Sequence, residues 1–213
     1  YVEKYFPPAA KERMLTLVKN LQTALGERIQ NLDWMSSETK VKAMEKLGTF
    51  HVKIGYPDTW RDYSALEIKD DSYWANIERA TRFEVDYMIA KAGKPVDKDE
   101  WLMTPQTVNA YYNPTTNEIC FPAGILQYPF FDMVADYAFN YGAIGVVIGH
   151  EMTHGFDDQG RQYDKDGNLK DWWTEEDARN FNAREEKYAA SFDKQLVWAT
   201  GHATGEWSVE SNI

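Results

Sequence analysis

The sequence predicts an α+β fold that is predominantly helical and contains a small β-sheet. Apolar residues recur at steps of three and four over long stretches, which is the period of an amphipathic helix. Short β-like runs flank a turn-rich segment in the middle of the chain, as in a β-hairpin. The chain has 213 residues and is 43% hydrophobic, which is enough to bury a core in one large domain, or in one domain plus a small satellite.

The N-terminal half is expected to be mainly helical. Residues 9–32 place six apolar side chains on one helical face: Met14, Val18, Leu21, Leu25, Ile29 and Leu32. A second helix is expected to begin at Ser36 or Ser37, either of which can cap it, and to run to about Leu47. A third follows the capping cluster 70–72 and ends at Gly93.

Strands and further helices follow in the rest of the chain. Short β-like runs are expected at 52–54, 106–112 and 118–121. The turn-rich segment 113–117 joins the last two runs into a hairpin. Further helices are expected over about 140–157 and about 174–197, on either side of a turn at 164–168.

Charge and cysteine content exclude several classes of function. The formal net charge of −11 and the pI of about 4.8 repel phosphates and anionic lipids, so neither nucleic acid nor a membrane is an expected partner. Cys120 is the single cysteine, which excludes an internal disulfide and a cysteine-based zinc cluster. No signal peptide is visible, and the start at Tyr1 without Met suggests a piece cut from a longer protein.

One segment carries metal-site chemistry: His150-Glu151-Met152-Thr153-His154. A helix turns once every 3.6 residues, so the two histidines lie on one face and can reach a single Zn²⁺ at about 2.0–2.1 Å. Glu151 lies about 100° around the helix, close enough to hold a water molecule without being a ligand. Zinc lowers the pKa of water towards about 7, and Glu151 takes the proton as the water attacks a carbonyl.

The alternative is a surface helix in which this pattern occurs by chance. Its context disfavours that interpretation, because two of the four histidines lie in the motif and the preceding turns are apolar. Gly142, Gly145 and Gly149 also precede or enter the motif helix, each costing about 1 kcal/mol relative to Ala in a helix interior. A helix that accepts three glycines is expected to have another backbone packed against it.

A catalytic zinc site needs a third protein ligand, and spacing leaves its identity open. Glu175 and Glu176 lie 21 and 22 residues after His154, about the separation found in thermolysin-like enzymes. Both also fit as first-turn acids favoured by a helix dipole. His51 and His202 are remote from the motif and are expected to be structural or exposed.

Two acidic positions near the motif each allow two interpretations. Asp157, three residues after His154, either accepts the second ring N–H of that histidine or is a solvated acid near the helix end. The run 164–167 suggests a calcium loop, but its glycine comes fourth and not sixth, so a plain turn is expected.

A series of runs, besides the motif, matches one group of enzymes, and several of them are specific to it. They are Trp34-Met35, Ile54-Gly55-Tyr56-Pro57, 96–101, Val108-Asn109-Ala110-Tyr111-Tyr112, 121–126, Asn140-Tyr141-Gly142, 148–158 and Asp171-Trp172-Trp173-Thr174. Over essentially its whole length the chain resembles the neprilysin and endothelin-converting-enzyme metallopeptidases, especially their bacterial endopeptidase O relatives. The resemblance implies a thermolysin-like zincin core with a small β-sheet and the HExxH helix, one Zn²⁺ per site, and endopeptidase activity.

The resemblance also implies a peptide-binding edge. Asn109 would hold the substrate backbone through its side chain and Ala110 through its main chain, as when a strand adds to a sheet edge. Asp157 falls where relatives buttress the second histidine. A pocket for the hydrophobic residue after the cut bond would be lined by Ile125, Phe130, Val146 and Val147.

One departure from the family concerns the third zinc ligand. Relatives supply it from a Glu-Asn-Ile-Ala-Asp run, whereas this chain reads Glu210-Ser211-Asn212-Ile213. Ser211 takes the ligand position and Glu210 falls one residue early, about 100° away on a helix, so Glu210 would coordinate only after a backbone shift. Family members place the acids at 175 and 176 outside the site.

The expected organisation is a helical linking region over residues 1–100 and a zinc peptidase core over 101–213 that is incomplete at its C-terminus. The expected function is hydrolysis of peptide bonds on the amino side of hydrophobic residues, with His150, His154 and Glu210 on zinc and Glu151 as general base. The family's transition-state-stabilising His and Arg and its helical lid lie outside the chain, so the isolated chain is expected to be weak or inactive.

A rival function comes from another class, namely a catalytically impaired homologue that still binds peptides. Ser211 favours this rival, and the intact motif disfavours it. A structural zinc site is also disfavoured, because such a site has no need of Glu151. Expected partners are peptide substrates and the missing N- and C-terminal parts of the same enzyme, and the resemblance implies an extracytoplasmic location.

Overall fold

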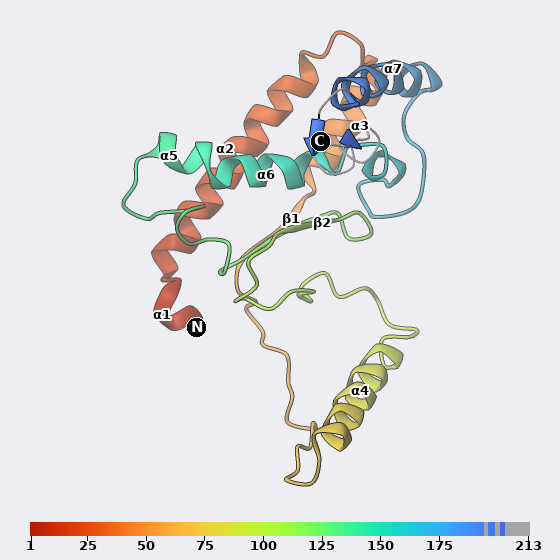
Figure 1. The fold of residues 1–213 in the computed structure, drawn as a ribbon. Coiled ribbons are helices and arrows are strands. Elements are labelled where there is room, and N and C mark those ends of the chain that lie inside the picture. The colour runs from red at the N-terminus through yellow and green to blue at the C-terminus, as the bar shows by residue number, and fades with distance from the viewer. Residues whose placement is uncertain (194–195, 199–200, 203–213) are drawn as a thin grey trace. The chain divides into compact units, whose positions relative to one another are not determined.

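The structure is a computed structural model that describes residues 1–193, 196–198 and 201–202 (Figure 1). It is mostly helical with a small three-stranded mixed sheet, as the sequence predicts. The chain divides into two compact units, one formed by Tyr1–Tyr56 with Met103–Ile213 and the other by Pro57–Leu102. The first 56 residues thus fold together with the later part of the chain. The assignment of residues 1–100 to a linking region stays a prediction.

Three N-terminal helices begin the first unit: α1 (Val2–Tyr5), α2 (Pro8–Gln30) and α3 (Ser37–Gly48). Pro8 occupies the first turn of α2, where its missing N–H breaks no helical hydrogen bond. The buried face of α2 consists of Ala10, Met14, Leu17, Val18, Gly26 and Ile29. Ser36 caps α3, with its hydroxyl accepting the Thr39 N–H at 3.3 Å. Both long helices lie close to their predicted bounds.

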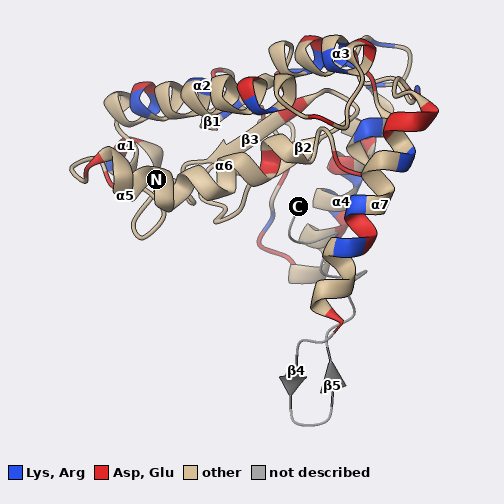
Figure 2. Cartoon of the chain, turned by 90° about the horizontal axis from the view of Figure 1, so that it is seen from above, with Lys and Arg blue, Asp and Glu red and all other residues tan. Residues whose placement is uncertain are grey.

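A three-stranded sheet with strand order β1-β3-β2 packs against α2 through β1, and Figure 2 labels its strands. β1 (His51–Gly55) runs parallel to β3 (Glu118–Pro122), and β2 (Tyr111–Asn113) runs antiparallel to it. All five residues of β3 are buried, while β2 is an edge strand. Asn117 closes the β2–β3 hairpin with φ 51, a left-handed conformation that Asn tolerates. The predicted hairpin is therefore present.

The first hairpin strand is shorter than predicted and begins at Tyr111. The segment before it packs instead against the loop after β3, where the Gly124 N–H donates to the Pro105 carbonyl at 2.8 Å. A Cβ on Gly124 would lie 2.5 Å from the carbonyl oxygens of Gln106 and Thr107, so only glycine allows this approach. This contact is tertiary, and an alternating sequence pattern cannot reveal it.

The helix predicted over about 140–157 is in fact two helices, α5 (Tyr137–Gly142) and α6 (Ile144–Thr153). Ala143 separates them with φ −106 and ψ −90, which are not helical values. The Ile144 N–H donates to the Phe130 carbonyl at 2.9 Å and so leaves the helical ladder. The motif consequently lies at the end of a ten-residue helix.

The expectation of a backbone packed against three glycines is wrong. A Cβ on Gly142 or Gly149 would meet no atom within 4 Å, and one on Gly145 would make only ordinary contacts. The close approaches lie after α6 instead. A Cβ would lie 2.9 Å from the Phe50 ring at Gly155 and 1.7 Å from the His154 carbonyl oxygen at Gly160.

The rest of the first unit contains η1 (Gly160–Gln162), α7 (Glu175–Phe192), β4 (Leu196–Trp198) and β5 (Gly201–His202). α7 is capped by Thr174, whose hydroxyl accepts the Asp177 N–H at 3.1 Å. It ends before the predicted residue 197. Both signs of charge are interspersed along α7, whereas Glu151 is the only Asp, Glu, Lys or Arg of α6 (Figure 2).

The second unit contains α4 (Tyr73–Ile89), which Ser72 caps by accepting the Ala75 N–H at 3.0 Å. Arg61 links the segment before α4 to the helix, because its guanidinium lies 4.0 Å from the Tyr87 ring centroid and 2.9 Å from Glu84. None of the helices in the described part of the chain has the length and apolar character that a membrane span requires.

Candidate metal centre

The two histidines of the motif bring their ring nitrogens together. His150 lies in the last turn of α6, and His154 follows that helix with φ −55 and ψ −26. Their Nε2 atoms are 2.9 Å apart, and the rings meet at 79°. Two Zn–N bonds of about 2.0–2.1 Å at a tetrahedral angle separate the nitrogens by roughly 3.3 Å. A widening of a few tenths of an ångström would let both nitrogens bind one zinc ion, so the pair fits this metal.

Asp157 orients the second histidine from the side away from His150. Its Oδ2 lies 2.6 Å from His154 Nδ1, and its Oδ1 accepts the backbone N–H groups of Gln159 and Gly160 at 3.1 and 2.6 Å. The hydrogen bond to Asp157 raises the pKa of His154, and burial acts in the opposite direction. With Nδ1–H donating to Asp157, the Nε2 lone pair is left for a metal.

Glu151 is buried beside the two histidines, with 7% of its surface exposed. Burial raises the pKa of its carboxyl group, while the charge of His154 and a hydrogen bond from the Tyr112 backbone N–H lower it. The Tyr112 bond links the motif helix to the edge strand β2. A carboxylate in this position can accept a proton in a partly desolvated environment.

A cavity of about 430 Å³ contains this group of side chains. The motif contributes His150, Glu151 and His154 to its lining, which also includes Asn109 and Ala110. These two residues immediately precede the edge strand β2, and the Asn109 side chain accepts the Ala110 N–H at 2.9 Å. The structure therefore brings the predicted peptide-binding edge and two of the three predicted metal ligands, His150 and His154, to one cavity, and their roles in binding stay predictions.

The four residues predicted to form an apolar specificity pocket do not line this cavity. Ile125 belongs to the buried core, Phe130 and Val147 are half-buried against it, and Val146 is 64% exposed on α6. Their role as a pocket stays a prediction.

The third ligand is not found within the described part of the chain. No group of three or more His, Cys, Asp or Glu side chains there could hold a metal ion. Glu210 and Ser211 lie outside the described residues. Glu175 and Glu176 lie in the first turn of α7 and do not line the cavity, and the Glu175 side chain is 96% exposed.

Sequence reasoning missed two residues that hold the site together. The Tyr112 N–H contacts Glu151, and nothing in the sequence indicates this because β2 and α6 are distant along the chain. Gly160 donates its N–H to Asp157, and here a local signal exists, because Asp followed by Gly three residues later is typical of a turn that the Asp side chain closes.

Comparison with known proteins identifies two matching family models, both described as peptidase family M13. One covers residues 1–57 and the other residues 109–213. The chain is 39% identical to an endothelin-converting enzyme homolog of Locusta migratoria over 220 residues, and 43% identical to neprilysin of Oryctolagus cuniculus over 189 residues. These alignments cover 100% and 85% of the chain, but only 30% and 25% of the relatives.

Solved structures show the same likeness. The Mycobacterium tuberculosis zinc metalloprotease Zmp1, in complex with an inhibitor, matches with a TM-score of 0.91 and 51% identity over 98% of this chain. PepO from Lactobacillus rhamnosis matches with a TM-score of 0.94 and 36% identity over the whole chain. The chain spans about a third of each of those structures, 32% and 34%. It belongs to peptidase family M13, the zinc metallopeptidase family of neprilysin and the endothelin-converting enzymes.

Proposed function

We propose that this chain supplies most of the catalytic core of a zinc metalloendopeptidase that cleaves oligopeptides on the amino side of hydrophobic residues. The observation that carries the proposal is the convergence of the His150 and His154 Nε2 atoms beside buried Glu151, in a cavity that also includes Asn109 and Ala110. Zinc held there would supply Lewis acidity, polarising a carbonyl and making a water molecule acidic near neutral pH.

Each side chain of the site has its own role in the proposed reaction. His150, His154 and Glu210 hold the metal, and Asp157 fixes the tautomer of His154. Glu151 accepts the proton of the attacking water and afterwards donates it to the leaving amine. An extended peptide lies along the β2 edge, held by Asn109 and Ala110, with its hydrophobic side chain towards Ile125, Phe130, Val146 and Val147.

We also propose how active the isolated chain is, which partners it has and where the protein is located. The chain spans about a third of its relatives, so the isolated chain is proposed to be weak or inactive without the rest of the enzyme. Its partners are peptides, with no role for nucleic acid or for membrane contact by this segment. Family resemblance supports an extracytoplasmic location.

A catalytically impaired peptide-binding homologue is the second candidate. The observation that favours it is Ser211, which stands at the position where the family has its third zinc ligand. Such a protein would still bind extended peptides at the Asn109 edge, but it would not turn them over.

Cleavage by the complete protein distinguishes the two candidates. Peptides that differ only in one residue, Phe or Asp, are incubated with zinc-loaded protein, and the products are identified by mass spectrometry. We expect cleavage before Phe, its loss on chelation, and a fall in kcat/KM of about 10²–10⁴-fold in Glu151→Gln. Glu175→Gln, at an exposed acid outside the cavity, serves as the matched control. Peptide binding without turnover by zinc-loaded protein would establish the second candidate instead.

A further inference from the structure

The segment after α6 packs directly on the backbone of the second histidine. A Cβ on Gly160 would lie 1.7 Å from the carbonyl oxygen of His154, so this close approach excludes any side chain. On the same segment, the Gly160 N–H donates to Asp157 Oδ1 at 2.6 Å, while Asp157 Oδ2 contacts His154 Nδ1. The position of Gly160 therefore affects both the backbone of His154 and the carboxylate that orients its ring.

A buried lysine from a distant helix holds this segment from its other side. Lys46, in the last turn of α3, is 1% exposed. Its Nζ donates to the Gly160 carbonyl at 2.6 Å and to the Tyr163 carbonyl at 2.7 Å. Gly160 is the first residue of η1 and Tyr163 directly follows its last residue. Lys46 therefore holds both ends of η1. Both bonds are charge-assisted, and such bonds are stronger than those between neutral groups.

The surroundings of the ammonium group favour a single position for it. Its Nζ lies 5.8–5.9 Å from the ring centroids of Tyr112, Phe156 and Trp172. Burial lowers the pKa of Lys46 to about 8, and the carboxylates of Asp157 and Asp164 oppose this shift. The lysine is thus mainly protonated at neutral pH and is attracted to the carboxylate that orients His154.

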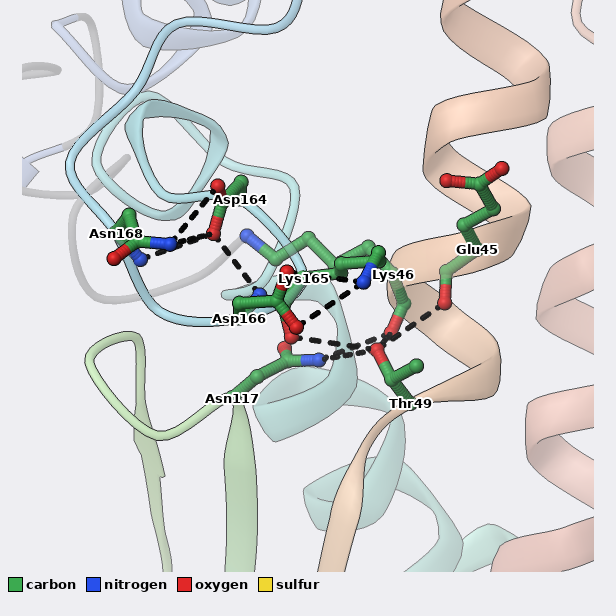
Figure 3. Close-up of polar contacts among 8 residues, drawn as sticks. All are labelled: Glu45, Lys46, Thr49, Asn117, Asp164, Lys165, Asp166 and Asn168. Carbon is green, nitrogen blue, oxygen red and sulfur yellow. Dashed lines mark hydrogen bonds and ion pairs between the residues drawn. The ribbon is translucent and has the colours of Figure 1, made fainter. Parts of the chain in front are cut away.

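The main chain of Lys46 is also held by a hydrogen bond. The buried Asn117 side chain donates to the Lys46 carbonyl at 3.0 Å and to Thr49 Oγ1 at 3.1 Å, as Figure 3 shows. The Tyr112 hydroxyl in turn donates to Asn117 Oδ1 at 3.0 Å. The end of α3 is therefore connected to the same hairpin whose Tyr112 N–H contacts Glu151.

We infer that Lys46 is a positioning residue for the metal site, which acts through Gly160 and Asp157 to keep the His154 ring in its metal-binding orientation. This inference rests on the proposed function, because it assumes that His154 binds zinc. The competing interpretation is that Lys46 only caps η1 and stabilises the fold. The two interpretations differ in whether the loss of Lys46 weakens zinc binding by folded protein.

The test is the zinc dissociation constant of the complete protein, measured by competition with a chromophoric chelator. Lys46→Met retains an unbranched side chain that is one atom shorter. It should fold, because the Gly160 carbonyl keeps the Tyr163 N–H and the Tyr163 carbonyl keeps the Trp172 Nε1–H. We expect zinc binding to weaken about tenfold, at the lower end of the range for outer-sphere partners. Lys40→Met is the matched control on the same helix, since Lys40 donates to the Leu32 carbonyl, and its zinc affinity should not change.

A double-mutant cycle identifies the route by which Lys46 acts. Asp157→Asn should itself weaken zinc binding about 10–100-fold, and adding Lys46→Met should then weaken it by less than about twofold, because the group through which Lys46 acts is gone. Effects that multiply in the double variant, or unchanged affinity in folded Lys46→Met, would overturn the inference. If Lys46→Met does not fold, Lys46→Gln is used instead, because it retains an amide that can donate but loses the positive charge. Lys46→Gln should weaken zinc binding by up to about tenfold, and unchanged affinity in this variant would also overturn the inference. Absence of zinc binding by the parent protein would contradict the proposed function instead.

Discussion

Gly160 lies where three constraints meet, because its backbone contacts His154, donates to Asp157 and accepts from Lys46. A side chain cannot be added there without moving the backbone of the second histidine. Glycines elsewhere near the motif are under no such constraint, since a Cβ on Gly149 would meet no atom within 4 Å. The importance of a glycine in this segment is therefore decided by what faces it, and not by its distance from the motif.

Gly160→Ala and Gly149→Ala form a matched pair of substitutions. Gly160→Ala should lower the free energy of unfolding by about 1–3 kcal/mol, because the new methyl group overpacks against the His154 carbonyl. Gly149→Ala, in the interior of α6, should raise it by about 0.5–1 kcal/mol through higher helix propensity. Urea denaturation of both variants measures the difference. Equal effects of the two substitutions would contradict the close approach at Gly160.

At the scale of secondary-structure elements, the N-termini of α3 and α7 are joined through one buried carboxylate. Asp177, 1% exposed, accepts hydrogen bonds from Ser36 N–H, Ser36 Oγ, Thr39 Oγ1 and Thr174 Oγ1 at 2.5–2.7 Å. Burial acts to raise the pKa of Asp177, but the hydrogen bonds from Ser36, Thr174 and Thr39 outweigh it and lower the pKa to about 2. The bonds to the charged form therefore dominate.

This carboxylate should make stability depend on pH in a defined window. Its pKa is about 2 in the folded chain and 3.8 as a free side chain, so its contribution is full above pH 4 and is lost as the pH falls from about 4 to about 2. Asp177→Asn should cost on the order of 2 kcal/mol at pH 7 and little near pH 2. Urea midpoints across this range measure the loss. Asp33→Asn, at a side chain that is 91% exposed, is the matched control for the loss of one carboxylate and should cost less than about 0.5 kcal/mol at pH 7.

At the scale of the whole molecule, zinc binding should be coupled to folding. The first unit holds both motif histidines and the segments that orient them, so zinc that binds only the folded state should stabilise this unit by mass action. At free zinc of about 100 times the Kd, the gain should be about 2.7 kcal/mol, seen as a rise in Tm. His154→Ala should abolish the rise, and magnesium, which prefers oxygen ligands, should not produce it. A rise of equal size in His154→Ala would place the zinc elsewhere.

Zinc binding by the whole chain also tests which residue is the third ligand. Glu210→Gln should weaken zinc binding if Glu210 completes the site, whereas Ser211→Ala should leave it unchanged. Zinc titration of the two variants, side by side with the parent chain, gives the answer. The opposite order of effects would assign the role of third zinc ligand to Ser211.

Much of the fold follows from local sequence signals. The amphipathic period of residues 9–32 predicts α2, and the turn-rich segment predicts the β2–β3 hairpin. The pair Ser36 and Ser37 and the capping cluster 70–72 predict where α3 and α4 begin. The errors lie where a tertiary contact overrides a local pattern. Ala143 breaks the motif helix because the next N–H pairs with Phe130, and the loop beside Gly124 shortens the first hairpin strand.

The sequence by itself determined the chemistry of the site, because two histidines four residues apart with a glutamate between them share one helix face whatever surrounds them. It also indicated Asp157, which is close enough along the chain for one helical turn to bring it to His154. Only the tertiary structure decided what holds these groups in place. Lys46 reaches Gly160 across 114 residues, and Tyr112 reaches Glu151 across two elements. Such contacts depend on how α3, the β2–β3 hairpin and α6 pack, and packing leaves no periodic signal in a single sequence.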